Sequence, residues 1–571
     1  MKRILTVSVI VLVCVGVIAG IVITSTGGVI GRGHAGGYDY TDSVGGAGGG
    51  DGYSGYSGGS PPVRYSTELD ENLGYSVGGA KDVNNFRENI ENGFLPLFTD
   101  ITYEGLFYDY YFDTGQRTTC THLFCPSYSY AVSRDPFSRM NEYYLSVGLN
   151  SNIKESDFHR KKLNLVIVLD ISASMSSSFD RYYYDSPSSS LPYQENEWDY
   201  RRSKIDLATE SVVALLDHLN SDDRFGMVLF NDYDQLLTPL KPVGFKNMGA
   251  LKQTILGLEA RGGTQLSAGM RAGTDLFGEL MYADPSEYEN RIVFITDAMP
   301  NIGDTSEWGL LGTLERNSEH GIYTTFIGIG VDFNTELVDY ITKIKGANYY
   351  SVHTPGELRW RMESEFEFMV TPLVFDLTLT LDAEGYEIVK VYGSPEANEA
   401  TGELMRVNTL FPSKIEGGEI RGGLILLELR RVSPETNLRL RVSYEDRVGH
   451  IYTDEAFIQM PEGHEYYQNS GIRKGILLSR YADLMKNWIN DERESYFEAK
   501  SLEPSIDWRT GIIVPEVPLG RWERQSIPLR VSTHYQHLFS HFSTYFENEM
   551  NSIGDSDLDQ ELTILDKLSN Y

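Results

Sequence analysis

Cysteine is scarce in this sequence, which limits how the fold can be cross-linked. The 571 residues include three cysteines, too few for a small, disulfide-dense scaffold. Cys14 lies inside an apolar run, so Cys120 and Cys125 are the one pair outside it. Their C-x4-C spacing allows a small disulfide loop if the segment is exported, with free thiols as the alternative. A zinc site would need two further ligands, and none has an obvious spacing nearby.

Positive charge is also in short supply. The sequence has 49 Lys and Arg residues against 81 Asp and Glu residues, which gives a formal net charge of −32. A field of this sign repels a phosphate backbone, and the sequence has no local basic patch that would overcome it. Nucleic acid is therefore not an expected partner. Strong acidity is compatible with attraction of divalent cations, although acidic solvated surfaces are common.

Several motifs of catalytic sites are missing. The sequence has no G-x-S-x-G nucleophile elbow, no phosphate-binding P-loop and no H-E-x-x-H zinc motif. Residues 31–36 (GRGHAG) match the dinucleotide-binding pattern G-x-G-x-x-G, but they follow a long apolar run instead of a strand of a β-α-β unit. The chain is therefore not expected to be an enzyme. A hydrolase with an unrecognised site is kept as an alternative.

The sequence begins with a long apolar run. Lys2 and Arg3 precede residues 4–23, which are uncharged and mostly apolar, and a helix of about 20 residues spans the hydrocarbon core of a bilayer. The run is longer than that of a typical signal peptide and lacks a good cleavage site, so a signal anchor over 1–24 is favoured, with cleavage as the alternative. Since flanking positive charges stay in the cytoplasm, we expect a single-pass cell-membrane protein with the bulk of the chain extracytoplasmic.

Composition and periodicity divide the rest of the chain into further regions. Residues 25–80 are rich in Gly, Ser and Tyr and are expected to form a flexible linker, followed by a small ordered segment over 81–158. Over 159–370, short apolar strands alternate with amphipathic helices, which predicts an α/β fold with a doubly wound, mainly parallel sheet. Over 371–462 the apolar period changes to two, which predicts a small antiparallel β-sandwich. Helices are expected over 463–571.

A set of hydroxyl and carboxylate side chains lies where an open α/β sheet binds ligands, beyond the carboxyl ends of the strands. Its members follow the apolar strand over 165–169, precede a helix that begins near residue 266, and follow the strand over 292–295. Such ligands, without His or Cys, suit Mg²⁺ best, with Mn²⁺ or Ca²⁺ as alternatives, and do not suit zinc. The simpler explanation is that these residues cap helices. The candidate metal ligands are Asp170, Ser172, Ser174, Thr264 and Asp297.

This set resembles the metal-ion-dependent adhesion site of von Willebrand factor type A (VWA) domains, and the resemblance covers about residues 160–370. It implies that the Ser and Thr hydroxyls and the two Asp carboxylates hold a divalent cation, directly or through water. It also implies that the cation takes a carboxylate from a partner protein. The metal should keep both Asp residues ionised, which leaves no free catalytic base. One departure from the family is a Tyr- and Ser-rich insertion over 176–201, expected to be a recognition loop, with a lid as the alternative.

A wider resemblance, to bacterial membrane-attached VWA proteins, rests on shorter motifs. These are VNNFR at 83–87, GFLP at 93–96, LSVGL at 145–149 and SRYADL at 479–484. The resulting hypothesis is a membrane-anchored, cell-surface VWA protein that binds a partner protein, presenting a carboxylate, through the metal. A structural or regulatory subunit of an envelope complex, with a stabilising metal, is the alternative.

Overall fold

The computed structural model describes residues 72–116, 121–185, 202–395, 404–433, 437–460, 464–502 and 519–571. The expected signal anchor over 1–24 and Cys120 lie outside these ranges. No helix within them is long and apolar enough to cross a membrane. The described residues fall into two compact units: one contains 135–140 and 531–571, and the other contains the remainder.

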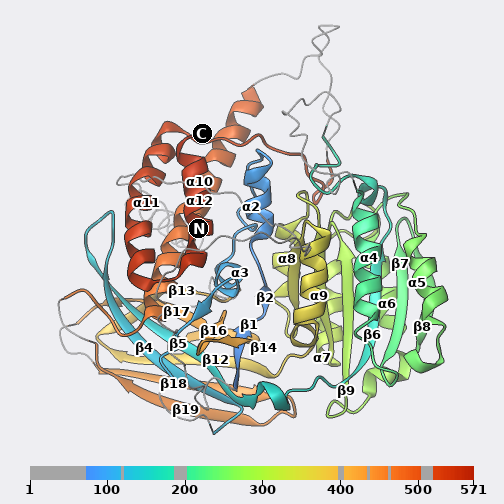
Figure 1. Ribbon diagram of the computed structural model, residues 1–571, viewed down its shortest axis with the longest axis horizontal. Helices are drawn as coiled ribbons and strands as arrows, with labels where there is room; N and C mark the ends of the chain where they lie inside the picture. The colour runs from blue at the N-terminus through green and yellow to red at the C-terminus, as the bar shows by residue number, and fades with distance from the viewer. Residues whose placement is uncertain are drawn as a thin grey trace, which may run out of the picture. The chain divides into compact units, whose positions relative to one another are not determined.

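The larger unit contains a seven-stranded sheet (Figure 1). Its strands are β2 (Gly79–Ala80), β6 (Lys162–Asp170), β7 (Arg224–Phe230), β8 (Asp234–Pro242), β9 (Tyr288–Thr296), β10 (Ile322–Ile329) and β11 (Asn348–Val352). They are arranged in the order β2-β11-β10-β9-β6-β7-β8. All neighbours are parallel except β7 and β8, which pair antiparallel at one edge. The sheet expected over 159–370 therefore forms, with one short strand, β2, contributed from before that region.

Helices cover both faces of this sheet. One face packs against α4 (Lys204–Leu216), α5 (Met248–Leu256) and α9 (Pro355–Val370), and the other against α6 (Leu266–Asp275), α7 (Glu307–Glu319) and α8 (Thr335–Thr342). Strand β6 supplies both cores, because successive strand residues face opposite sides of a sheet. Ile167 belongs to the first core and Val168 to the second, and both are fully buried. Each such side chain contributes about 1.5–3 kcal/mol to stability through burial.

A second sheet in the larger unit is antiparallel and has ten strands. They are β1 (Asn72–Val77), β4 (Phe124–Arg134), β5 (Asn141–Lys154), β12 (Val374–Glu384), β13 (Tyr386–Tyr392), β14 (Leu404–Ser413), β17 (Leu424–Arg431), β18 (Asn437–Asp446), β19 (Ile451–Ile458) and β20 (Tyr466–Tyr467). The main path is β13-β17-β5-β1-β14-β12-β18-β19, with β4 paired to β5 and β20.

This topology corrects two expectations from the sequence. Residues 371–462 do not form a small sandwich of their own, because β1 and β5 lie between β17 and β14 in the sheet. A period of two indicates which face of a strand is buried but not which strand is its neighbour. Of the linker expected over 25–80, residues 72–80 form β1 and β2 instead, and residues 25–71 lie outside the described ranges. In β1 the alternating Leu73, Tyr75 and Val77 are all buried.

Smaller elements lie between the strands of the two sheets in the chain. Helices α2 (Asn84–Glu91) and α3 (Tyr103–Tyr108) follow β2, and β3 (Tyr111–Phe112) pairs with β16 (Glu419–Arg421), which pairs with β15 (Ile415–Glu416). The ordered segment expected over 81–158 is thus divided between helices beside the α/β region and strands of the antiparallel sheet.

Helices make up most of the described residues after 463, but β20 and the non-helical residues 519–532 interrupt them, and residues 503–518 lie outside the described ranges. Helix α10 (Ser470–Leu502) belongs to the larger unit and packs against α3 and β17. Trp488 in this helix is fully buried, and its indole N–H donates to the carbonyl oxygen of Arg530 at 3.0 Å. Helices α11 (Thr533–Ile553) and α12 (Asp559–Ser569) pack against each other in the smaller unit.

Candidate metal-binding site

Asp170 is the last residue of β6, an interior strand of the sheet, and its carboxylate is fully buried. Oδ1 accepts a hydrogen bond from the backbone N–H of Ser172 at 2.8 Å. Oδ2 accepts one from the hydroxyl of Thr296, at the end of the neighbouring strand β9, at 2.7 Å. Two strand ends therefore fix the orientation of this carboxylate at the carboxyl edge of the sheet.

Ser172 and Ser174 lie in the loop that follows Asp170, where Ala173–Ser176 form a short 3-10 turn. Both serine side chains are buried, and their hydroxyl oxygens are 3.1 Å apart. The backbone N–H of Ala173 donates to the carbonyl oxygen of Gly262 at 2.9 Å. This bond ties the first loop of the site to the loop that carries Thr264.

Thr264 precedes α6 and is also buried. Its backbone N–H donates to Oδ1 of Asn301 at 2.9 Å, and its carbonyl oxygen accepts from the N–H of Asn301 at 3.0 Å. Asn301 thereby holds the Thr264 loop against the segment that follows β9. Gly262 in this loop has a φ of +82°, and a Cβ atom there would lie 2.2 Å from Oδ2 of Asp232. The backbone conformation and the close approach both require glycine.

Asp297 follows β9 and is fully buried. Its Oδ2 accepts a hydrogen bond from Nζ of Lys204 at 3.0 Å, whereas its buried Oδ1 has no hydrogen-bond partner among the described residues. Lys204, the first residue of α4, also lies 2.5 Å from Oδ1 of Asp332. All three side chains of this ion-pair network are fully buried.

The electrostatics of this edge are dominated by buried negative charge. Burial, and then the charge of Asp297, raises the pKa of Asp170 to about 7, although hydrogen bonds from Ser172 and Thr296 oppose the shift. Burial alone would lower the pKa of Lys204, but the charges of Asp297 and Asp332 outweigh it and raise the pKa. The Lys204 ammonium pairs with two carboxylates, and the third, Asp170, is close enough to Asp297 for the two charges to repel. With every group ionised, these three carboxylates and one ammonium sum to a charge of −2.

The five expected ligands therefore meet at one edge of the sheet, and their chemistry fits a divalent cation. The set offers three hydroxyls and two carboxylates, which are hard oxygen donors. Asp297 Oδ1 is the clearest indication, since a buried carboxylate oxygen without a partner is costly unless a cation or water satisfies it. Among the described residues no group of three or more His, Cys, Asp or Glu side chains could hold a metal ion; the expected set includes only two such residues.

Sequence reasoning missed Lys204 and Asp332. Asp332 follows β10 by three residues, so the rule that pointed to Asp170 and Asp297 applies to it as well. Lys204 gives a weaker signal: it begins α4 beside the apolar residues Ile205 and Leu207, and a lysine at the start of a helix is usually solvated.

The described root of the insertion lies beside this edge. Residues 186–201 are outside the described ranges, but residues 176–185 are described and attach to the domain through two buried side chains and several hydrogen bonds. Phe179 and Tyr182 are buried, and the backbone N–H of Tyr183 donates to Oδ2 of Asp332 at 3.1 Å. The carbonyl oxygen of Phe179 accepts from the N–H of Val331 at 2.8 Å. The root of the insertion is thus attached to the loop that carries Asp332.

A second segment that sequence reasoning missed reaches the same edge. Residues 519–530, here called the rim segment, connect the α10 region to α11. Trp522 is buried, and its indole N–H donates to the carbonyl oxygen of Thr305 at 2.9 Å. Ser526 donates through its N–H and its hydroxyl to the carboxylate of Asp185 at 2.9 and 2.7 Å. The rim segment and the insertion root therefore hold each other in place next to the candidate site.

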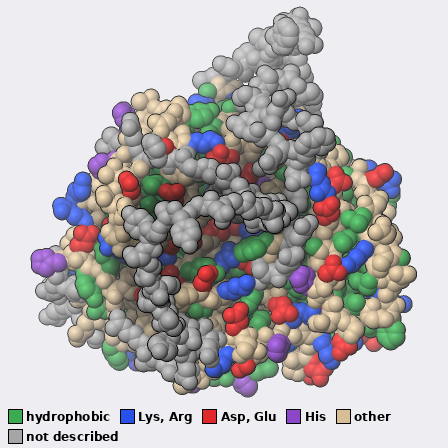
Figure 2. Space-filling model, in the orientation of Figure 1, with side chains coloured by type: hydrophobic (Ala, Val, Ile, Leu, Met, Phe, Trp, Pro, Cys, Tyr) green, Lys and Arg blue, Asp and Glu red, His purple; other side chains and the backbone are tan. Residues whose placement is uncertain are grey.

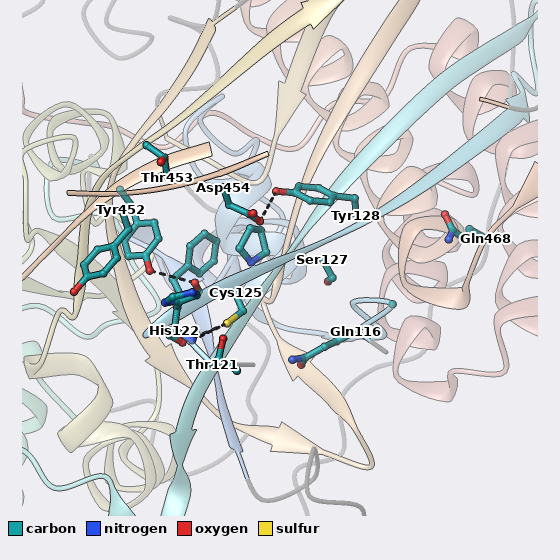
Figure 3. Close-up of a pocket in the computed structure, with 14 residues that line it drawn as sticks. Gln116, Thr121, His122, Cys125, Ser127, Tyr128, Tyr452, Thr453, Asp454 and Gln468 are labelled. Carbon is teal, nitrogen blue, oxygen red and sulfur yellow. Dashed lines mark hydrogen bonds between the residues drawn. The ribbon is translucent and has the colours of Figure 1, made fainter. Parts of the chain in front are cut away.

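The cysteine prediction concerns a different part of the molecule. Cys125 in β4 is disulfide-bonded; its expected partner Cys120 lies outside the described residues. Cys125 lines a cavity of about 490 Å³ in the antiparallel sheet (Figure 3). There the hydroxyl of Tyr128 donates to Asp454 at 3.5 Å, and Tyr452 lies on the opposite side of the cavity. None of the five expected metal ligands lines this cavity.

The seven-stranded sheet and its helices form an α/β domain, and candidate oxygen ligands lie beyond the carboxyl ends of its strands. Residues 165–299 match the von Willebrand factor type A domain family. The chain therefore contains a VWA domain, and Asp170, Thr264 and Asp297 lie within the matched residues.

Relatives of this chain are distant. Inter-alpha-trypsin inhibitor heavy chain H4 of Bos taurus is 20% identical over 315 residues, which are 53% of this chain and 32% of that protein. An uncharacterised protein of Synechocystis sp. is 21% identical over 217 residues, 38% of this chain and 44% of that one. The chain thus spans less than half the length of either relative. The crystal structure of an ArnB paralogue from Sulfolobus acidocaldarius aligns with a TM-score of 0.35 and 13% identity over 79% of this chain and 95% of its own.

Proposed function

We propose that the VWA domain binds a divalent cation, with Mg²⁺ as the favoured ion, and that this cation binds a carboxylate of a partner protein. The single observation that carries the proposal is the buried Oδ1 of Asp297, which has no partner among the described residues. With every group ionised, Asp297, Asp170, Asp332 and Lys204 together carry a charge of −2. A dication would balance this charge. Burying unpaired carboxylates without such compensation costs several kcal/mol.

The residues at this edge of the sheet would have different roles in holding the cation. The hydroxyls of Ser172, Ser174 and Thr264 would hold the cation without neutralising it, and the bound cation would supply an electrophilic position for an acidic group of a partner. Asp170 would contribute a carboxylate whose orientation is set by Thr296. Lys204 holds one oxygen of Asp297 and leaves the other available.

We further propose that the chain is anchored in the cell membrane by residues 4–23, with the rest of the chain outside the cytoplasm. The length and hydrophobicity of this run and the preceding Lys2 and Arg3 support the proposal. The disulfide at Cys125 also supports it, because disulfides persist in oxidising compartments.

The surface is compatible with a protein partner. On the face drawn in Figure 2, Lys and Arg side chains are interspersed with Asp and Glu side chains, and the net charge of the chain is −32. These features support the expectation that nucleic acid is not a partner. We also expect the chain not to be an enzyme, and turnover in a broad hydrolase screen would contradict that expectation.

The experiment that tests the function is capture of a partner from an envelope extract by the full chain, in Mg²⁺ and in EDTA. The variant is Asp297→Ala. The matched control is Asp222→Asn, which removes an exposed carboxylate just before β7, at the amino end of that strand. We expect one retained protein that is lost in EDTA and with Asp297→Ala but not with Asp222→Asn.

Capture that persists with the Asp297→Ala variant, correctly folded by circular dichroism, would overturn the proposal. A large fall in melting temperature in EDTA, without metal-dependent capture, would instead favour the structural subunit of an envelope complex.

A further inference from the structure

Glu523 of the rim segment is linked to Thr264 of the candidate site through the side chain of Asn301. Its Oε1 accepts hydrogen bonds from Nδ2 of Asn301 at 2.9 Å and from the hydroxyl of Tyr184 at 2.5 Å. The same Asn301 side chain accepts from the backbone N–H of Thr264 at 2.9 Å. Burial, then the hydrogen bond to Glu523, and then the negative charges of Glu523 and Asp297 raise the pKa of the Tyr184 hydroxyl. Glu523 therefore belongs to the rim of the site, although it is 222 residues from Asn301 in the sequence.

The carboxylate of Glu523 is held by neutral groups. Besides Asn301 and Tyr184, the backbone N–H of Gly520 donates to Oε2 at 2.6 Å. Within the described part of the chain, the hydrogen-bond partners of the Glu523 carboxylate are all neutral groups, and its side chain is only partly buried. These contacts orient the carboxylate without neutralising it, so a negative charge is fixed one hydrogen-bonded side chain, Asn301, away from Thr264.

The position of Glu523 does not depend on the rim segment alone. Tyr184 and Asp185 belong to the root of the insertion, and Asp185 binds Ser526 three residues after Glu523. The carbonyl oxygen of Tyr184 also accepts from Nε2 of Gln525 at 2.9 Å. The insertion root thus acts as a positioning element for the carboxylate.

We propose that Glu523 is a specificity-determining residue of the adhesion site, which selects partner segments in which the acidic residue has a basic neighbour. The proposal rests on the proposed function. A second fixed negative charge beside a carboxylate-binding position repels an acidic partner, and a cation on that partner removes the repulsion and pairs with Glu523. An acidic residue flanked by neutral residues would keep the contact with the metal but lose this pairing.

The test uses two synthetic peptides of equal length, one with Asp followed by Arg and one with Asp followed by citrulline, which has nearly the shape of Arg without its charge. Binding to the full chain is measured by fluorescence anisotropy in Mg²⁺ and in EDTA. We expect Mg²⁺-dependent binding of both peptides, with the Arg peptide about fivefold tighter, the size expected of a partly exposed ion pair.

The variant Glu523→Gln separates this role from a structural one. Gln keeps an oxygen that can accept from Tyr184 and Asn301, so the fold should persist, as checked by circular dichroism and melting temperature. We expect the variant to bind both peptides equally, whereas the control Asp222→Asn keeps the fivefold preference. Equal binding of the two peptides by the unmodified chain, or an unchanged preference in Glu523→Gln, would overturn the specificity proposal alone. Absence of Mg²⁺-dependent binding of either peptide would overturn the proposed function and this inference with it.

Discussion

Replacing Lys204 by Met tests the ion-pair network under the site. The Lys204 ammonium lies 3.0 Å from Asp297 Oδ2 and 2.5 Å from Asp332 Oδ1, and all three side chains are fully buried. Methionine fills a similar volume without charge, so two buried carboxylates would lose their counter-ion. Removing one partner of a buried ion pair costs about 3–5 kcal/mol, because the remaining charge stays desolvated. We therefore expect Lys204→Met to lower the free energy of unfolding by about this amount.

The assay is urea unfolding followed by circular dichroism, with Lys252→Met as the matched control. Lys252 pairs with Asp217, whose side chain is 67% exposed, so its removal should cost less than about 1 kcal/mol. Added Mg²⁺ should recover part of the loss in Lys204→Met and none in the control, because a cation at the site would compensate Asp297. If Lys204→Met were no less stable than Lys252→Met, the network would not hold the site as described.

Two further changes test the packing around this domain. His353 is buried, neither of its ring nitrogens has a partner among the described residues, and burial lowers its pKa to about 4. Its ordinary pKa is 6.5, so between those values the unfolded chain binds a proton that the folded chain does not. Stability should fall through this window as the pH is lowered, by about 2 kcal/mol at pH 5. The stability difference between the unmodified chain and His353→Leu should therefore shift by that amount from pH 7.5 to pH 5, and a constant difference would contradict the reasoning. Gly262→Ala should weaken Mg²⁺ binding and lower the melting temperature, because Asp232 and the positive φ exclude a Cβ atom; unchanged values would show that the loop adapts.

The expected ligands could be found from the sequence because their signal is local. Asp170 and Asp297 each follow an apolar strand, and strand ends in an open α/β sheet meet at one edge. The same rule could have found Asp332 after β10. Lys204 could not be assigned in this way, since its burial depends on two carboxylates from distant loops.

The rest of the architecture depends on long-range pairing that periodicity does not specify. The alternation in β1 and β5 indicates strands with a buried face, but their position between β17 and β14 is set by tertiary contacts. Glu523 is a similar case. Nothing in the sequence around it indicates a link to Asn301 or Tyr184, because the link is formed by side chains far apart in the chain.

The most direct test of the candidate site is a calorimetric titration of the metal-stripped full chain with Mg²⁺. The unmodified chain and Asp222→Asn should each bind a single Mg²⁺ ion, whereas Asp170→Asn and Asp297→Asn should bind it far more weakly or not at all while remaining folded by circular dichroism. Absence of binding to the unmodified chain, or equal binding to Asp297→Asn, would contradict the assignment of this edge of the sheet as a divalent-cation site.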